Sequence, residues 1–208
     1  MIRSWAFILI ILVASSVQAA KRPNLVLILA DDLGWADLSC YGNDLHETPN
    51  LDRLAAEGMV FTQHYAGSTV CAPSRASLMS GLHTGHTVIR GNREVQPEGQ
   101  HPIPDSRITV AERLREAGYR TAAIGKWGLG APGTEGVPNR QGFDYFFGYN
   151  GQRQAHSYYP AHLWRNEERI DLGGNRAGAR GIYSHDVLVE EVLRFVREAA
   201  DAPFFLYA

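Results

Sequence analysis

The sequence has few cysteines and no excess of basic residues. Its 208 residues include two cysteines, and 20 lysine and arginine residues stand against 22 aspartate and glutamate residues, a formal net charge of −2. Nucleic-acid-binding proteins normally carry a basic excess. The basic residues are also dispersed, which argues against a polybasic membrane patch. With 45% hydrophobic and 20% charged residues, the composition is that of a globular domain with enough apolar side chains for a core.

Long apolar segments are lacking as well. The apolar run Ala6–Val13 is shorter than the roughly 20 residues that a membrane-spanning helix needs. It follows Arg3 and precedes Ser15–Ala19, a stretch with the small residues that signal peptidase accepts. We therefore interpret residues 1–19 as a cleaved signal peptide, with an N-terminal membrane anchor as the alternative. This interpretation predicts an exported protein, periplasmic or extracellular, without stable membrane insertion.

Strand-like and helix-like segments alternate along residues 20–208. The aliphatic run Asn24–Ala30 ends at Asp31-Asp32 and is typical of a central strand buried on both faces. Because strands and helices alternate, we predict an α/β fold with a mostly parallel central sheet flanked by helices. Helices are predicted from Thr48 to Gly58, from Pro73 to Ser80, from the capping box Thr109-x-x-Glu112 to Gly118 and from Ser184 to Ala200, and further strands at 59–61, 119–124 and 204–207.

Two other regions are predicted from composition. The stretch Gly128–Gly181 is rich in glycine, proline, tyrosine and arginine, and we expect it to form loops around the functional site. The last apolar strand runs to Ala208 without a cap or a polar tail, so we expect the domain to be truncated at its C-terminus.

Four short motifs carry the chemistry. Cys71-Ala72-Pro73-Ser74-Arg75 is followed by Leu78-Met79-Ser80-Gly81, preceded by Asp31-Asp32 and followed later by Gly125-Lys126-Trp127. In this order the motifs resemble the formylglycine-dependent sulfatases, the arylsulfatase-like members of the alkaline phosphatase superfamily. The resemblance runs from Asn24 to the end of the chain. It implies that residues 20–208 are the N-terminal part of a sulfatase catalytic domain with an alkaline-phosphatase-like sandwich fold.

The resemblance assigns the nucleophile to Cys71. It implies that a formylglycine-generating enzyme oxidises this cysteine to formylglycine, whose hydrate attacks sulfur and later releases sulfate as the aldehyde reforms. The predicted helix supports this position, because free N–H groups and the positive end of the helix dipole stabilise an anion at a helix N-terminus. From the residues alone, a disulfide with Cys40 or a buried structural cysteine is the alternative. If Cys71 is modified, Cys40 is expected to be a small buried residue.

The adjacent carboxylates Asp31 and Asp32 predict a metal site. Two neighbouring carboxylates repel each other unless a cation lies between them, and hard oxygen ligands suit Ca²⁺ or Mg²⁺. The resemblance implies Ca²⁺, with Mg²⁺ second, bound by Asp31, Asp32 and the residue formed from Cys71. An aspartate pair that caps a turn is the alternative. The family completes this site with a later Asp-Asn pair that has no counterpart in these 208 residues, so we expect this part of the protein to be inactive alone.

Three further residues are predicted to act on the substrate. Arg75 matches the arginine that holds the nucleophile and metal ligands, and Lys126 matches the family's sulfate-binding lysine. The family pattern Gly-Lys-Trp-His-Leu-Gly has Gly128 here in place of histidine. We expect His156 to replace it as an acid or base. Weaker candidates for the same role are His83, His86, His162 and His185.

These features predict a sulfuric ester hydrolase that requires Ca²⁺ and formylglycine. Export and the aromatic residues Tyr158, Tyr159 and Trp164 favour a sulfated sugar or polysaccharide as substrate, while a small aryl sulfate remains open. A phosphodiesterase or phosphonate monoester hydrolase that uses formylglycine is the alternative enzyme. A non-catalytic remnant is the alternative outside enzymes, because the usual histidine is absent.

Overall fold

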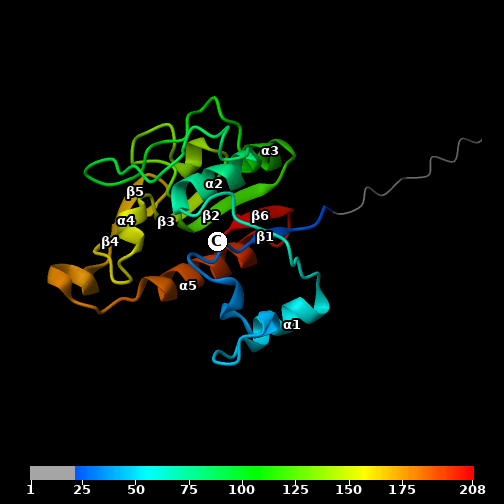
Figure 1. Ribbon diagram of the computed structural model, residues 1–208. Coiled ribbons are helices and arrows are strands. Elements are labelled where there is room, and N and C mark those ends of the chain that lie inside the picture. The colour runs from blue at the N-terminus through cyan, green and yellow to red at the C-terminus, as the bar shows by residue number, and fades with distance from the viewer. Residues whose placement is uncertain (1–21) are drawn as a thin grey trace, which may run out of the picture.

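The computed structural model describes residues 22–208, so the predicted signal peptide lies outside the described residues. Six strands form one sheet: β1 (Leu25–Leu27), β2 (Arg120–Lys126), β3 (Tyr145–Tyr149), β4 (His162–Arg165), β5 (Glu168–Asp171) and β6 (Phe204–Tyr207). Their order across the sheet is β1-β6-β2-β3-β4-β5 (Figure 1). The first four strands of this order are parallel, and β4 and β5 add an antiparallel hairpin at one edge. The prediction of a mostly parallel α/β sheet is confirmed.

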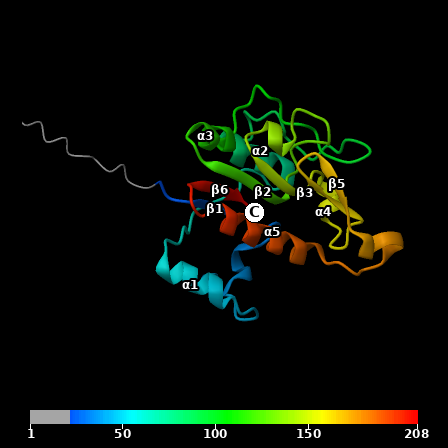
Figure 2. The same cartoon turned by 180° about the vertical axis from the view of Figure 1, so that it is seen from behind.

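Helices cover both faces of this sheet. Figures 1 and 2 show α2 and α3 on one face and α5 across the other. In addition to these, α1 stands apart from the sheet and α4 follows β3. The bounds are α1 (Pro49–Glu57), α2 (Cys71–Ser80), α3 (Val110–Glu116), α4 (Gln152–Ala155) and α5 (Ser184–Glu198), with 3-10 helices η1 (Trp35–Asp37), η2 (Ser39–Tyr41), η3 (Pro138–Arg140) and η4 (Gly173–Gly178). None of the helices within residues 22–208 is both long and apolar enough to cross a membrane.

The alternation of strand side chains explains the two layers. Ala123 and Phe205 point to the face where α2 and α3 pack. Their neighbours Ala122 and Leu206 point to the opposite face, against Phe195 of α5. Because successive side chains of a strand point to opposite faces, a strand covered on both sides is apolar at nearly every position. All of β6 and residues 122–124 of β2 show this pattern, and both strands lie in the middle of the sheet.

Two predicted strands differ in the structure. Residues 24–30 were expected to form a central strand, but β1 is an edge strand of three residues, with Val26 and Ile28 exposed. Residues 59–61 form no strand, and Met59 and Phe61 are exposed. Both predictions rested on apolar composition, which shows that a segment can be buried but not that another element covers it.

The region from Gly128 to Gly181 is more regular than predicted. It contains β3, the hairpin β4–β5, the short helix α4 and two 3-10 helices. Its Tyr145–Tyr149 segment is a buried central strand that pairs with β2. Aromatic residues favour strands when they pack on a half-buried surface, so composition alone misassigned this region.

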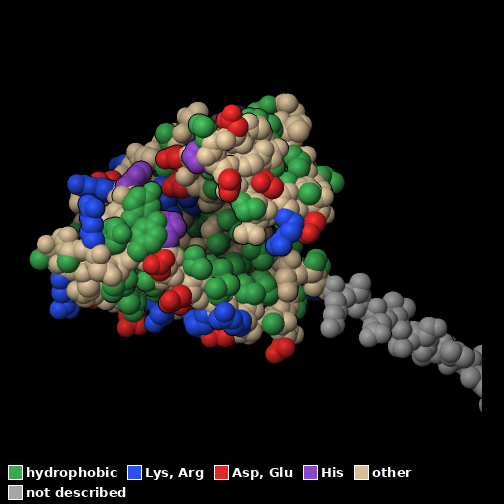
Figure 3. Space-filling model, turned by 90° about the horizontal axis from the view of Figure 1, so that it is seen from below, with side chains coloured by type: hydrophobic (Ala, Val, Ile, Leu, Met, Phe, Trp, Pro, Cys, Tyr) green, Lys and Arg blue, Asp and Glu red, His purple; other side chains and the backbone are tan. Residues whose placement is uncertain are grey.

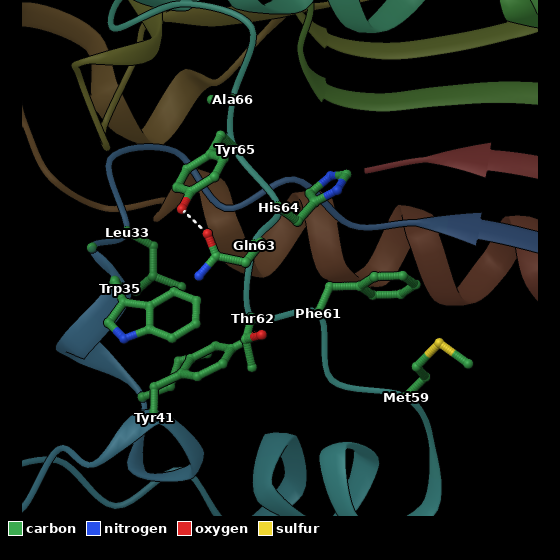
Figure 4. Close-up of a pocket in the computed structure, with 12 residues that line it drawn as sticks. Leu33, Trp35, Tyr41, Met59, Phe61, Thr62, Gln63, His64, Tyr65 and Ala66 are labelled. Atoms are coloured by element: carbon green, nitrogen blue, oxygen red, sulfur yellow. Dashed lines mark hydrogen bonds between the residues drawn. The ribbon is translucent and has the colours of Figure 1, made fainter.

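The N-terminal third of the described chain is little buried. No residue from 22 to 70 is classed as buried. In this segment Leu33, Trp35, Met59, Phe61 and Tyr65 line a cavity of about 740 Å³ (Figure 4). On the face seen in Figure 3, hydrophobic side chains gather around a hollow in the surface. Cys40, predicted to be buried, is exposed in η2 of this segment.

Candidate functional site

The site lies where the carboxyl ends of parallel strands meet the N-terminus of α2. Asp31 follows β1, Lys126 ends β2 and Tyr207 ends β6, while Cys71 is the first residue of α2. Ligands of open α/β sheets bind beyond the carboxyl ends of the strands. The helix begins two residues earlier than predicted, so that Cys71 lies within its first turn rather than ahead of it.

Lys126 joins the two predicted functional groups. Its Nζ donates a hydrogen bond to Asp31 Oδ2 at 2.5 Å and another to Cys71 Sγ at 3.3 Å. Arg75 Nη2 lies 3.8 Å from Asp31 Oδ1. The side chains of Lys126 and Arg75 are 8% and 5% exposed, whereas that of Asp31 is 41% exposed. Two nearly buried cations therefore face one accessible carboxylate, and the pocket favours a further anion.

The ionisation of Asp31 follows from the same contacts. Partial burial of its carboxyl raises the pKa, but the hydrogen bond from Lys126 and the positive charges of Lys126, Arg75 and His156 outweigh it. The pKa of Asp31 is therefore lowered from its ordinary value. Asp31 is a carboxylate throughout the neutral range and can act as a permanent negative ligand.

Arg75 is held by two acceptors that sequence analysis did not identify. Its Nη1 donates to the carbonyl oxygen of Lys126 and to the hydroxyl of Tyr207 at 2.7 Å. Burial is the main cause that raises the pKa of Tyr207, so its hydroxyl stays protonated. The signal that could have identified Tyr207 is its position at the carboxyl end of an apolar strand, because Lys126 also lies at the carboxyl end of a strand.

The N-terminus of α2 is also held in place. Ala72 N donates to Asn92 Oδ1 at 3.0 Å, and Ser74 N donates to the carbonyl of Val70 at 3.2 Å in the first helical turn. Cys71 is half-buried, and both cysteines are free thiols. The alternative of a Cys40–Cys71 disulfide is therefore wrong for this structure.

The residues predicted to bind metal share a cavity. Asp31, Asp32, Cys71 and Arg75 are among the residues that line a cavity of about 220 Å³. Within residues 22–208, no group of three or more histidine, cysteine, aspartate or glutamate side chains could hold a metal ion. Calcium takes six to eight oxygen ligands. Asp31 and Asp32 supply carboxylate oxygens, which are the ligand type of such a shell, but only a part of its number.

His156 lies beside this cavity rather than in it. It caps the C-terminus of α4 and is exposed. It lines a neighbouring cavity of about 320 Å³ together with Asn92, Gln152 and Arg153. Among the described residues, His156 makes no side-chain hydrogen bond with Cys71 or Lys126. Its charge nevertheless acts on Asp31.

The weaker histidine candidates are engaged elsewhere. His162 Nε2 lies 2.7 Å from Glu98 Oε2. The ring of His185 stacks on Tyr183 with the ring centroids 5.3 Å apart. His83 Nδ1 accepts a hydrogen bond from Gly85 N at 3.1 Å, and the rings of His83 and His86 lie edge to face. None of these four histidines lines the cavity that contains Cys71, and neither does His156.

The sulfatase family model matches residues 23–208. The chain belongs to the sulfatase family. It is 35% identical over 226 residues to N-acetylgalactosamine-6-sulfatase of Canis lupus familiaris, an alignment that covers 98% of this chain and 42% of that protein. It is 40% identical over 225 residues to arylsulfatase G of Mus musculus, covering 93% of this chain and 41% of that protein. The chain thus spans less than half the length of these relatives.

Solved sulfatase structures share the fold. The crystal structure of Ps i-CgsB in complex with k-i-k-neocarrahexaose matches with a TM-score of 0.77 and 30% identity, covering 90% of this chain and 44% of that one. The predicted alkaline-phosphatase-like sandwich is therefore confirmed for the part of the sulfatase fold that these residues form.

Proposed function

We propose that this chain is the N-terminal part of a sulfuric ester hydrolase that cleaves a sulfate ester on a sulfated sugar or polysaccharide. The observation that carries the proposal is the position of Lys126 Nζ, which bonds both Asp31 and Cys71 while the buried Arg75 lies alongside. This arrangement provides a nucleophile position, a cationic pocket and a carboxylate within one cavity. A sulfate ester is an anion whose leaving oxygen gains charge as the ester breaks, and such a pocket stabilises that charge.

Cys71 is proposed as the site of the nucleophile. Conversion of its side chain to formylglycine would supply a hydroxyl that can attack sulfur and a carbonyl that can reform afterwards. Lys126 would bind a sulfate oxygen, because its Nζ lies 3.3 Å from the Cys71 sulfur in a nearly buried position. The positive end of the α2 dipole would stabilise the same anion, although the N–H groups of Ala72 and Ser74 are already hydrogen-bonded and Pro73 has none. Arg75 would hold Lys126 and Asp31 in position, because it contacts the carbonyl oxygen of Lys126 and the carboxylate of Asp31.

Asp31 and Asp32 are proposed as ligands of Ca²⁺, together with the side chain at position 71. When bound, the ion would add positive charge next to the sulfate group. Mg²⁺ is the less suitable ion, because it requires near-ideal octahedral geometry and Ca²⁺ accepts irregular oxygen shells.

His156 is proposed as the acid that protonates the leaving alcohol. It lies at the end of α4 on a cavity that also contains Asn92, the residue that caps the start of α2. An imidazole can donate a proton to a leaving oxygen, which is the role proposed for His156.

The substrate class is proposed from the relatives and the loops. One relative is named for N-acetylgalactosamine 6-sulfate, and one structural neighbour is described with a neocarrahexaose. Tyr158 is exposed close in sequence to His156, and Arg153 lines the same cavity as His156. An aryl sulfate is a useful probe because it tests the sulfate site without a sugar.

Mass spectrometry tests the modification and the partner that makes it. The protein should be purified from its native host, where the formylglycine-generating enzyme is expected to act. The tryptic peptide Leu54–Arg75 contains Cys71 and no internal lysine or arginine. An aldehyde in place of the thiol supports the proposed nucleophile. An unmodified thiol would overturn it and favour a non-catalytic role. N-terminal sequencing of the same protein should begin at Ala20 if residues 1–19 are removed on export.

Ester selectivity tests the reaction. The whole protein should hydrolyse sulfate monoesters in preference to phosphodiesters and phosphonate esters, and chelation of Ca²⁺ should lower the rate. A clear preference for phosphodiesters would replace sulfate ester hydrolysis with the alternative phosphodiesterase.

A further inference from the structure

A polar cavity of about 350 Å³ lies between α4 and the loop of residues 94–100, and the proposed reaction does not use it. The loop is closed by backbone hydrogen bonds from Val95 N to Gly99 O at 3.2 Å and from Gln100 N to Gly130 O at 2.9 Å. The polar side chains that line the cavity come from this loop, from α4 and from β4, and they are Glu94, Glu98, Arg153, Gln154 and His162. One wall of the cavity is therefore a loop held by its backbone, and this wall carries both glutamates.

Glu98 is fixed in this wall by two side chains of β4. Its Oε1 accepts a hydrogen bond from Trp164 Nε1 at 2.7 Å, and its Oε2 lies 2.7 Å from His162 Nε2. The side chain of Glu98 is 19% exposed, so its carboxylate still borders the cavity. Each carboxylate oxygen has two lone pairs and can accept one more hydrogen bond. Glu98 is thus an acceptor held in one position at the cavity wall.

This cavity adjoins the one next to the start of α2. Glu94 and Arg153 line both cavities, and Arg153 Nη1 lies 3.7 Å from Glu94 Oε2. The second cavity, of about 320 Å³, also contains Asn92, whose Oδ1 accepts the N–H of Ala72, the residue after the nucleophile position. Together the two cavities form a polar groove that runs from Asn92, beside the start of α2, to Glu98.

The polar groove differs in charge from the sulfate site. Around the nucleophile position, the nearly buried Lys126 and Arg75 favour an anion. The polar groove presents the carboxylates of Glu94 and Glu98, and the guanidinium of Arg153 is 81% exposed and pairs with Glu94. A sulfate or carboxylate group would meet like charge there, which is unfavourable at a binding site. A sugar hydroxyl both donates and accepts hydrogen bonds, so it can bond to the carboxylates and to the guanidinium.

We propose that the polar groove is a subsite for a neutral sugar unit that adjoins the sulfated one. Glu94 and Glu98 accept hydrogen bonds from the hydroxyls of this unit, and Arg153 donates to them. The two carboxylates exclude an adjoining unit that carries a sulfate or a carboxylate group. This inference rests on the proposed sulfate ester hydrolysis and adds to it the chemistry of the neighbouring sugar unit.

A glycan array tests the inference by binding, without turnover. The whole mature protein carrying Cys71→Ala is applied to oligosaccharides that contain one sulfated unit, arrayed in pairs whose adjoining unit is either neutral or sulfated. We expect binding to the neutral member of a pair to be tighter by about tenfold or more, because like charges placed together at a binding site are costly. Glu94→Gln and Glu98→Gln, each added to this protein, should reduce the preference, because they remove a charge and keep the side-chain volume.

Glu168→Gln is the matched control, because it removes the same charge from an exposed position of β5 outside the polar groove. It should leave the preference unchanged. Since Glu98→Gln also alters the contact with His162, Glu94→Gln must reduce the preference by itself.

Three results would overturn the inference: binding to no arrayed sugar, equal or tighter binding when the adjoining unit is sulfated, or an unchanged preference in Glu94→Gln. Hydrolysis of an aryl sulfate by the protein with Cys71 intact is measured in parallel. If the aryl sulfate is hydrolysed, any of these results overturns the subsite alone. If it is not hydrolysed, the proposed function fails as well.

Discussion

At the scale of single residues, the site is an excess of positive charge held around one carboxylate. Lys126 and Arg75 are nearly buried and face Asp31, and Arg75 is itself fixed by the hydroxyl of Tyr207. Burial lowers the local dielectric and makes these charges act more strongly than surface charges would. The sulfate-binding role proposed for Lys126 is supported by its Nζ, which also reaches Cys71.

Replacement of Lys126 should show this directly. Lys126→Ala is expected to lower kcat/KM for a sulfate ester by about 10²–10³-fold, the typical loss when one preorganised donor to a developing anion is removed. Arg113→Ala is the control, because this arginine forms a surface ion pair with Glu116 and is 61% exposed. Steady-state kinetics measures both variants. A change of kcat/KM in Lys126→Ala no larger than in the control would contradict the role of Lys126.

At the scale of elements, the start of α3 is set by a capping box. Thr109 N donates to Glu112 Oε2 at 2.6 Å, and Glu112 N donates to Thr109 Oγ1 at 3.2 Å. The hydroxyl of Thr109 also donates to the carbonyl of Gln141 at 2.7 Å, and the residue is 1% exposed. The cap therefore also ties α3 to the loop before β3.

Thr109→Ala should destabilise the fold by about 1 kcal/mol or more, the usual cost of a lost N-cap. Thr109→Ser retains the hydroxyl and should recover most of the loss. Chemical denaturation followed by circular dichroism measures both variants. Equal stability of the alanine and wild-type proteins would show that the cap contributes nothing.

A partly buried ion network, in which Glu191 is buried and Arg194 is exposed, connects α5 to β3. Glu191 accepts hydrogen bonds from Tyr145 and Arg194. Burial of Glu191 raises its pKa, but the hydrogen bonds from Arg194 and Tyr145 outweigh burial, and the pKa is lowered from the ordinary value of 4.5. A carboxyl with a lowered folded-state pKa stabilises the fold above its unfolded-state pKa and loses this contribution as the pH falls through the folded value.

The stability of the protein should therefore fall in acid. Tm should be nearly constant above about pH 5 and decrease as the pH falls below the unfolded-state pKa of Glu191. Glu191→Gln should be less stable at neutral pH and should show a smaller decrease in acid. Thermal unfolding at several pH values measures both. Parallel curves for the two proteins would mean that this network does not contribute to the acid sensitivity.

At the scale of the whole molecule, burial is uneven. Residues 22–70 contain no buried residue, whereas α2, β2, β3 and β6 supply most of the core. Two methionines report on this difference, because Met59 is 78% exposed and Met79 of α2 is 1% exposed.

Oxidation of the 208-residue chain should distinguish the two methionines. Hydrogen peroxide is expected to convert Met59 to the sulfoxide much faster than Met79, since oxidation follows exposure. Peptide mapping by mass spectrometry measures both sites in one sample, so each serves as the control for the other. Similar rates at the two sites would contradict the packing of α2 against the sheet.

Much of the fold and of the candidate site could be predicted from local sequence. The capping box of α3, the apolar stripe of α5 and the strands β2 and β6 follow from spacing and composition over a few residues. The resemblance implied one site that contains Asp31, Cys71 and Lys126. The structure brings these three residues into contact.

The features that could not be predicted from local sequence depend on contacts between segments that are distant in the chain. Neither the edge position of β1 nor the exposure of Cys40 follows from neighbouring residues, because each depends on which element packs opposite. The region that contains β3 was predicted to form loops from its glycine-rich composition. Composition does not show that Tyr145–Tyr149 pairs with β2 as a strand. The contact between Gln152 and Gly128 also joins two separate segments of the chain and does not follow from their neighbours in sequence. Local chemistry determines which elements can form and which residues can react, whereas burial and side-chain contact depend on the packing of segments far apart in the chain.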